Sequence, residues 1–440
     1  MSNTTKKYWS RIMKLALPIM INNVIAQLQM LIDKMFLGRL ELTCTSAVGN
    51  ATAPMWTTMS TVFSLTLGGT ILISQAIGAN DMDKAKGIMA SVFKYINVLA
   101  LFWFLVWMFG APLIFKIMKV QDTVIDMSIR YARYFAPVFL ITGITSAISS
   151  LLQVSEKTKI LVVYGIIRSG LNIFLDYCMI FGNCGFSRME VTGAALATTI
   201  AEYVGIIIIV LYVILQKKLI VKPKMADIFK AKFTYFWSSV KVGIPAALED
   251  FAWNLGNLFL IVMLNNISDS AAGVYSIVFT VELLPVAIIS ALGQATVTLS
   301  GQEVGRKNKR GVRSIVKISA AVCAVLNAVI LVCFIAFPKI IMSAFTTDKG
   351  VIAAAAIYLV IVGIDLFPKA GNIVIGSGIR GYGDTKWMLK TQLCGTAFVV
   401  AGSAILVLGF GLGMTALFWL VVADETLRCG LNFWRLIRIS

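Results

Sequence analysis

The sequence predicts an all-α integral membrane protein, with twelve transmembrane helices in two six-helix lobes related by a pseudo-two-fold axis along the membrane normal. The first observation behind this is composition, because 58% of the 440 residues are hydrophobic and only 14% are charged. A soluble domain of this size carries about 25% charged residues, so most of this surface must face lipid. The second observation is that apolar runs of bilayer-spanning length recur from end to end, and the third is an internal repeat.

The apolar runs indicate twelve spans, each near the roughly 20 residues that cross a bilayer. Lipid offers no hydrogen-bond partners, so each span must satisfy its own backbone as a helix. Alternating strands typical of a barrel are absent from the sequence. The predicted spans are 14–38, 47–78, 88–117, 124–153, 160–182, 191–216, 235–265, 270–303, 313–343, 350–379, 387–410 and 414–436.

Lysine and arginine are concentrated in alternate loops, most densely at 217–232 and 306–313. Positive loops remain in the cytoplasm, and both termini fall on the same side as these loops. The net charge of +18 is therefore a topology signal and not a sign of nucleic-acid binding. No small-residue cleavage site follows the first apolar run, so we expect a retained first helix. These features predict a multi-pass protein of the cell membrane with both termini in the cytoplasm.

A constant offset of 227 residues relates the two halves of the chain. Pro18 matches Pro245, Gln75 matches Gln302, and "EKTK" at 156–159 matches "GDTK" at 383–386. The repeat predicts an N-terminal lobe at 1–216, a cytoplasmic linker at 217–232 and a C-terminal lobe at 233–440. Six helices per half insert the same way up, which suits rocking alternating access around a site near the midplane.

Several function classes are excluded by what the sequence lacks. There is no histidine, and the seven cysteines form no CxxC pair, which argues against a structural zinc site and against His-dependent catalysis. The glycine-rich segment at 381–385 lacks a phosphate-loop pattern. We therefore predict no enzyme, no ATP use, no nucleic-acid partner and no cofactor, and we expect a monomer in the lipid bilayer.

Polar residues form a stripe along the first predicted helix. Pro18, Asn22, Gln29 and Asp33 share one helical face. Because polar and acidic side chains are costly inside a membrane, we expect this face to border a cleft, with Asn22 and Gln29 in a substrate cavity. The alternative for Asp33 is a position near the outer interface, paired with Lys34.

The fifth predicted helix carries a second polar group, in which Asn172 and Asp176 are four residues apart on one face. A helix-packing network is the alternative explanation. Adding 227 to Asp33, Asn172 and Asp176 gives Leu260, Val399 and Ser403. Because the second half lacks these acids, the pattern favours a single functional site in the N-terminal lobe.

The chain resembles the multidrug and toxic compound extrusion (MATE) family over nearly its whole length. The resemblance rests on the order and spacing of six segments, which are LPIMINNVIAQLQMLIDKMFLGRL, GGTILISQAIGANDMDKA, LNIFLDYCMIFG, TGAALATT, TVTLSGQEVGRKN and GSGIRGYGDTK. It implies two six-helix lobes, a central cavity, and export of cationic or amphiphilic small molecules by antiport with Na⁺ or H⁺. Trp253 and Lys369 fall near positions where the NorM-like branch has acids, which favours the DinF-like branch.

The resemblance also implies roles for individual residues. Asp33 matches the coupling residue of the family, and Asn172, Asp176 and Thr198 match the residues that join it around a cation. A carboxylate shielded from water disfavours its charged form and can take up a proton. The same residues also offer the oxygen ligands that Na⁺ prefers, so the ion remains open. A hydroxyl that packs helices together explains Thr198 equally well.

The C-terminal lobe supplies further candidates for the cavity. Glu282 resembles a family acid that meets cationic substrates, and a salt bridge is the alternative for it. Asp250 and Asn254 make another polar face, whereas Asp365 and Lys369, four residues apart, are expected to pair.

Other transport classes fit less well. The main alternative is a lipid-linked oligosaccharide flippase of the same broad superfamily, whose cavity should instead be rich in arginine and lysine. A major facilitator is disfavoured because "GANDMDKAK" at 78–86 does not match the motif of that class.

Overall fold

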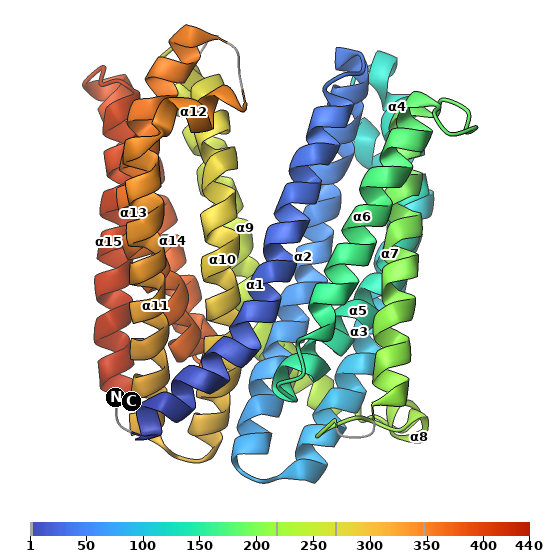
Figure 1. Ribbon diagram of the computed structural model, residues 1–440, viewed down its shortest axis with the longest axis vertical. Coiled ribbons are helices and arrows are strands. Elements are labelled where there is room, and N and C mark those ends of the chain that lie inside the picture. Colours follow the sequence, from blue (N-terminus) through green and yellow to red (C-terminus); the bar gives the residue numbers. More distant parts are fainter. Residues whose placement is uncertain (1–2, 217–218, 269–270, 346–347) are drawn as a thin grey trace. The chain divides into compact units, whose positions relative to one another are not determined.

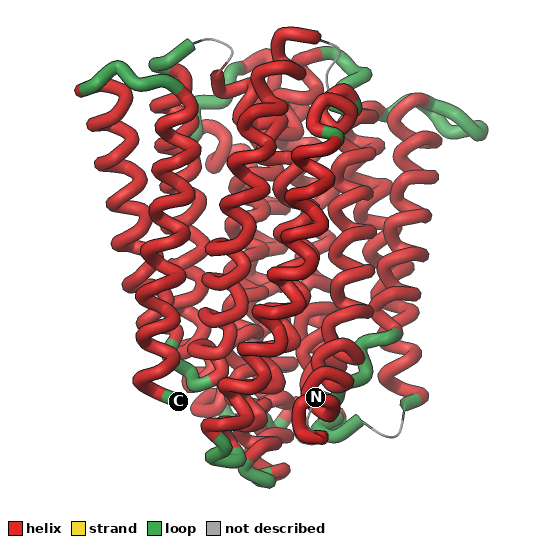
Figure 2. Tube along the Cα trace, turned by 60° about the vertical axis from the view of Figure 1, so that its left-hand side comes forward, coloured by secondary structure: helices red, strands yellow, loops and turns green. Residues whose placement is uncertain are grey.

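The computed structural model describes residues 3–216, 219–268, 271–345 and 348–440. Within these ranges the protein is helical and contains no strand, and short loops join the helices (Figure 2). The all-α prediction is confirmed. Residues 217 and 218 of the predicted linker lie outside the described residues.

The first half of the chain supplies six spans from seven long helices. The fourth predicted span is two helices, because Pro137 has no backbone N–H and begins a new helix where the preceding one ends. The helices are α1 (Asn3–Leu37), α2 (Leu42–Gly78), α3 (Met82–Ile117), α4 (Asp122–Phe135), α5 (Pro137–Val154), α6 (Ile160–Phe181) and α7 (Glu190–Leu215), followed by the short α8 (Met225–Phe229).

The second half repeats this order with three differences, the first being that its fourth span, α13, is one continuous helix. A short helix beginning at Pro338 follows its third span, and a π-helical turn ends its fifth. The elements are α9 (Phe233–Asn265), α10 (Ala271–Gly305), α11 (Lys309–Ala336), α12 (Pro338–Ser343), α13 (Lys349–Gly381), α14 (Thr385–Ala404), η1 (Ile405–Gly409) and α15 (Met414–Ile439).

Twelve spans result for the described part of the chain when α4 and α5 are taken as one. Eleven described helices are long and apolar enough to cross a membrane by themselves. The twelfth span is α15, whose interior contains Asp424, Glu425 and Arg428. These residues are buried or paired within the protein, which is the usual way that charges are tolerated in such a helix.

By internal packing the chain forms two compact units. One, here the C-terminal unit, contains residues 1–16, 78–80 and 245–440, and the other, the N-terminal unit, contains 17–77 and 81–244. The start of α1 and the end of α15 lie at the same end of the C-terminal unit (Figure 1). The divisions within α1 and α9 fall next to the repeat-related prolines Pro18 and Pro245.

Small residues let helices of the N-terminal unit approach closely. A Cβ atom added to Gly68 on α2 would lie 2.2 Å from the backbone oxygen of Ser239 on α9, and one added to Gly243 would lie 2.7 Å from the backbone of Leu65. Such small-residue contacts are typical of helix packing in membranes, where lipid removes the hydrophobic drive for association. A core around Trp107, Phe115 and Phe139, all at most 1% exposed, completes this unit.

Candidate functional site

A polar cluster lies inside the N-terminal unit, and Gln29 of α1 is its centre. The Gln29 amide donates a 2.5 Å hydrogen bond to Asn172 of α6 and a long one of 3.5 Å to Asp33, and its oxygen accepts 2.7 Å from Ser169. Gln29 is only 8% exposed. Buried polar groups are stable only when hydrogen-bonded, so these contacts explain how α1 and α6 keep a polar interface.

Asp33 and Asp176 are brought together at this cluster. Their carboxyl groups lie within hydrogen-bonding reach of one another. Asp176 is 1% exposed, and the Oδ1 atom of each residue is buried without a hydrogen-bond donor among the described residues. Two carboxylates in contact repel each other, so the pair is stable when a proton or another cation lies with it.

Asn172 and Thr198 extend the cluster to a third helix. Asn172, which is fully buried, donates 3.3 Å to the Thr198 hydroxyl of α7. That hydroxyl donates in turn to the backbone oxygen of Ala194 at 3.0 Å, which leaves its lone pairs facing Asn172. The residues that the sequence predicts for cation coupling are thus collected from α1, α6 and α7.

Asn22, predicted to line the cavity, lies lower on the same stripe of α1. A Cβ atom added to Gly165 of α6 would lie 2.4 Å from the Oδ1 atom of Asn22, so the Asn22 side chain packs directly against this glycine. The Oδ1 atom is buried and accepts no hydrogen bond from a described residue.

A partly buried ion pair lies beside the cluster. Arg168 of α6 donates 2.6 Å to Glu202 of α7, and the Tyr164 hydroxyl donates 2.9 Å to the same carboxylate. The side chains of Arg168 and Glu202 are 15% and 17% exposed. Glu202 is therefore the direct partner of Arg168, whose positive charge also acts on Asp33.

The donor set fits a proton or a hard cation. Two carboxylates, an amide oxygen and a hydroxyl are the ligand types that Na⁺ accepts. Among the described residues, no group of three or more His, Cys, Asp or Glu side chains converges on one point. The carboxylates of Asp33 and Asp176 supply the negative charge that a bound cation would balance.

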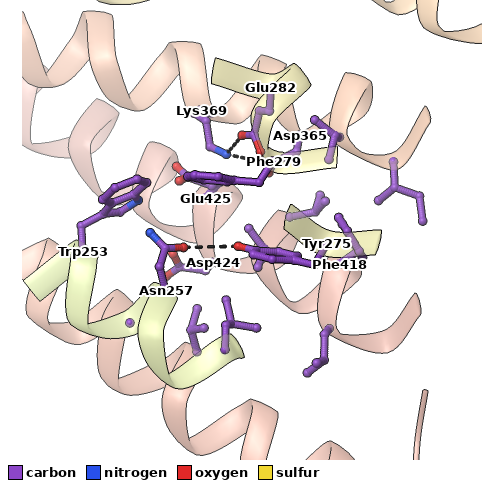
Figure 3. A pocket seen from close by; sticks show the side chains of 18 of the residues that line it. Trp253, Asn257, Tyr275, Phe279, Glu282, Asp365, Lys369, Phe418, Asp424 and Glu425 are labelled. Carbon is purple, nitrogen blue, oxygen red and sulfur yellow. Dashed lines mark hydrogen bonds and ion pairs between the residues drawn. The ribbon is translucent and has the colours of Figure 1, made fainter. Parts of the chain in front are cut away.

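A second polar site is a pocket in the C-terminal unit, and it contains Glu282 (Figure 3). The Lys369 ammonium of α13 contacts the Glu282 carboxylate of α10 and lies 2.7 Å from Asp365. The expected pairing of Asp365 with Lys369 is present, and Glu282 joins it. The pocket also meets Asp424, Glu425 and Arg428 of α15.

Asp250 and Asn254, predicted to line the substrate cavity, lie outside the lining of this pocket. Both are exposed on α9, and the Asn254 amide donates 2.8 Å to the backbone oxygen of Asp250. Neither is among the described residues that line the pocket.

The sequence analysis did not predict the network of hydrogen bonds and ion pairs around Arg428. Arg428 bonds to Asp424, Glu425 and the Gln392 oxygen at 2.9, 2.7 and 2.5 Å. Asn372 of α13 also donates to Glu425. The sequence signal was the presence of three charges within five residues of an apolar helix, which is costly unless they are paired.

Comparison with known sequences identifies a family that covers most of the chain. The sequence pattern of the MatE family matches residues 18–178 and again residues 245–406. A probable multidrug resistance protein NorM of Thermotoga maritima is 29% identical over 390 residues, which cover 85% of this chain and 80% of the relative.

Solved structures share the fold. A MATE protein crystallised with MaL6 superimposes with a TM-score of 0.90 at 19% identity, covering 100% of this chain and 99% of that one. An outward-facing multidrug resistance MATE family transporter of the MOP superfamily superimposes with a TM-score of 0.89 at 19% identity, covering 100% of this chain and 98% of that one. At such low identity the likeness establishes the fold alone. The comparisons do not separate the branches of the family, so the DinF-like assignment stays a prediction.

Proposed function

Since the chain belongs to the MATE family, whose members are membrane transporters and not enzymes, we propose that it exports cationic or amphiphilic small molecules by antiport with Na⁺ or H⁺. The relative from Thermotoga maritima is a probable multidrug resistance protein, which supports drug-like cargo. The observation that carries the coupling proposal is the pair of buried Oδ1 atoms on Asp33 and Asp176, which receive no hydrogen bond from the described residues.

In this proposal the polar cluster of the N-terminal unit couples transport to the cation through its negative charge. A cation bound between Asp33 and Asp176 removes their repulsion, and the Gln29 and Asn172 side chains keep the pair in register through their 2.5 Å hydrogen bond. Thr198 adds a hydroxyl oxygen from α7. When the cation leaves, the carboxylates of Asp33 and Asp176 remain charged and close together inside the protein. This repulsion favours either a rearrangement of the helices that carry them or the binding of a new cation.

We propose that the cation and the cargo favour opposite-facing states of the two lobes, which alternate by rocking. A ligand shifts such an equilibrium only by its differential affinity for the two states. Entry of the cation from outside then favours the state in which cargo is released outside. The positively charged loops support a cytoplasmic position for both termini in the cell membrane.

The flippase alternative is not favoured by the charges at the polar cluster. A pyrophosphate group would meet Asp33 and Asp176, and the nearby Arg168 is already neutralised by Glu202 at 2.6 Å. An anionic cargo would therefore be repelled where a cationic one is attracted.

The proposal is tested by ethidium efflux from proteoliposomes that contain the purified protein, with a Na⁺ gradient and a pH gradient imposed separately. We expect at least one gradient to drive efflux and its collapse by the matching ionophore to stop it. Equal ethidium movement with and without either gradient would contradict antiport, and uptake of a lipid-linked oligosaccharide in place of ethidium would favour the flippase.

A further inference from the structure

The segment between α7 and α9 lies outside the spans and includes the short helix α8. It follows the end of α7 at Leu215 and leads into α9, which begins at Phe233. Figure 1 shows α8 beyond the end of α7, and it packs on α3. Since one span ends just before this segment and another begins just after it, the segment lies at the level of the lipid headgroups, which border the hydrocarbon core.

Hydrogen bonds hold this segment on the N-terminal unit. The Lys222 ammonium donates to two backbone oxygens of the last turn of α7, at 2.6 and 2.9 Å. Such a lysine stabilises the end of a helix. The Lys94 ammonium of α3 donates 2.9 Å to the Phe229 backbone oxygen, and the Tyr95 hydroxyl donates 3.3 Å to that of Ala231. The segment is therefore a fixed part of this unit, and its exposed side chains form a defined surface.

Large apolar side chains of this segment and of the start of α9 are exposed. Met225 and Phe229 are 69% and 73% exposed, and they share a face of α8 because they are four residues apart. Phe233 and Trp237 of α9 are also exposed, and their rings stack at 6.2 Å. Aromatic side chains are enriched where a membrane meets water, and apolar faces flanked by lysine are typical of helices that lie in that interface.

The same surface is positively charged. Residues 219–232 contain four lysines and a single acid, Asp227. Lys224, Lys230 and Lys232 are exposed, and none of their ammonium groups forms an ion pair with another described residue. Asp227 accepts 2.9 Å from the backbone N–H of Lys224. The three ammonium groups are therefore available to an anion next to the exposed apolar side chains.

We propose that residues 219–237, here called the linker surface, bind anionic phospholipids, with phosphatidylglycerol as the model ligand. The lipid phosphates contact the ammonium groups, while Met225 and Phe229 insert among the acyl chains. A phosphatidylcholine headgroup has no net charge and gains less from the lysines. An acidic peptide would match the lysines, but it would leave the apolar side chains without a partner. This inference goes beyond the proposed antiport and needs neither a gradient nor cargo.

The test is photochemical crosslinking from inside the linker surface, in vesicles that contain both phosphatidylglycerol and phosphatidylcholine. Phe229 is replaced by the photoreactive amino acid benzoylphenylalanine, and mass spectrometry identifies the crosslinked lipids. Each lysine near a membrane favours an anionic lipid by about fivefold, so phosphatidylglycerol should be enriched at least about fivefold over its share of the vesicle. The triple variant Lys224→Gln, Lys230→Gln and Lys232→Gln should lose this enrichment.

A matched control removes three exposed lysines elsewhere, in the triple variant Lys116→Gln, Lys119→Gln and Lys339→Gln. It should keep the enrichment at the same photoreactive position, and an equal loss there would overturn the proposal. If the first triple variant fails to fold, high salt replaces it as the test, because salt screens exposed charges. The enrichment should then fall without any substitution of lysine.

Three results would contradict a site for anionic lipid. One is crosslinking of the two lipids in proportion to the composition of the vesicle at low salt. Another is enrichment that is unchanged at high salt. The third is a crosslink to a protein in place of lipid in vesicles of native membrane, which would indicate a protein partner. All of these readouts are independent of whether a Na⁺ or pH gradient drives efflux.

Discussion

Gln29 on α1 and Asn172 on α6 are joined by a 2.5 Å hydrogen bond across 143 residues of sequence. Gln29 also bonds to Asp33 and Ser169. One amide therefore holds the acid of α1 against the polar face of α6, so the geometry of the proposed cation site depends on a residue that carries no charge of its own.

Gln29→Leu removes these bonds while it keeps a similar volume. We expect the concentration of Na⁺ or H⁺ that gives half-maximal ethidium efflux to rise about tenfold, because each lost buried hydrogen bond weakens the site by about 1 kcal/mol or more. The dependence of efflux on ion concentration in proteoliposomes measures this. Gln121→Leu, at an exposed position before α4, is the control. An unchanged ion dependence in Gln29→Leu would show that the amide does not position the site.

Replacing either acid of the pair should uncouple transport. Asp33→Asn and Asp176→Asn keep the shape of the side chain and remove the charge that binds the cation, so gradient-driven ethidium efflux should fall to the level of empty liposomes. Asp126→Asn, on the exposed face of α4, should transport like the wild type. Wild-type efflux from a well-folded Asp176→Asn protein would exclude that residue from coupling.

The Arg168–Glu202 pair should contribute to stability through burial. Arg168→Met leaves the partly buried Glu202 charged, with the Tyr164 hydroxyl as its remaining partner, which is expected to cost at most about 3–5 kcal/mol. Arg188→Met breaks an exposed pair with Glu190, whose two side chains are 60% and 44% exposed, and should cost at most about 1 kcal/mol. Thermal unfolding in detergent compares them: the melting temperature should drop clearly for Arg168→Met alone. Equal decreases in melting temperature for Arg168→Met and Arg188→Met would contradict the role of burial in the stability of the Arg168–Glu202 pair.

The close contact of α2 with α9 predicts a strict requirement for glycine. In Gly68→Ala the new Cβ atom would lie 2.2 Å from the Ser239 backbone oxygen, whereas at Gly49 of the same helix a Cβ atom meets nothing within 4 Å. Gly68→Ala should lower the melting temperature and the yield of monodisperse protein, and Gly49→Ala should not. Normal stability of Gly68→Ala would show that the helices separate readily at this point.

The polar faces of α1 and α6 were predictable because helical periodicity acts within one helix, whereas their role in coupling stays a prediction. The spacing of Gln29 and Asp33, and that of Asn172 and Asp176, puts each pair on one face. The cost of acids in lipid marks both faces as important. Periodicity does not say which faces meet, and the pairing of α1 with α6 was instead an implication of the family resemblance.

The pocket in the C-terminal unit was harder to predict for the same reason. The spacing of Asp365 and Lys369 predicted their contact, but Glu282 comes from α10, 87 residues earlier than Lys369. The partners of Arg428 likewise include side chains of α14 and α15. The fourth span also differed from prediction, since Pro137 divides it into two helices.

Infrared difference spectroscopy of the carboxyl groups tests the central claim most directly, with reconstituted protein exposed to Na⁺ at fixed pH and, separately, to lower pH without Na⁺. The account predicts that at least one of these cations changes the carboxyl bands of the wild-type protein, and that this change is lost in both Asp33→Asn and Asp176→Asn. A band change of the same size in either variant would contradict it, because the cation would then bind without the pair of acids between α1 and α6.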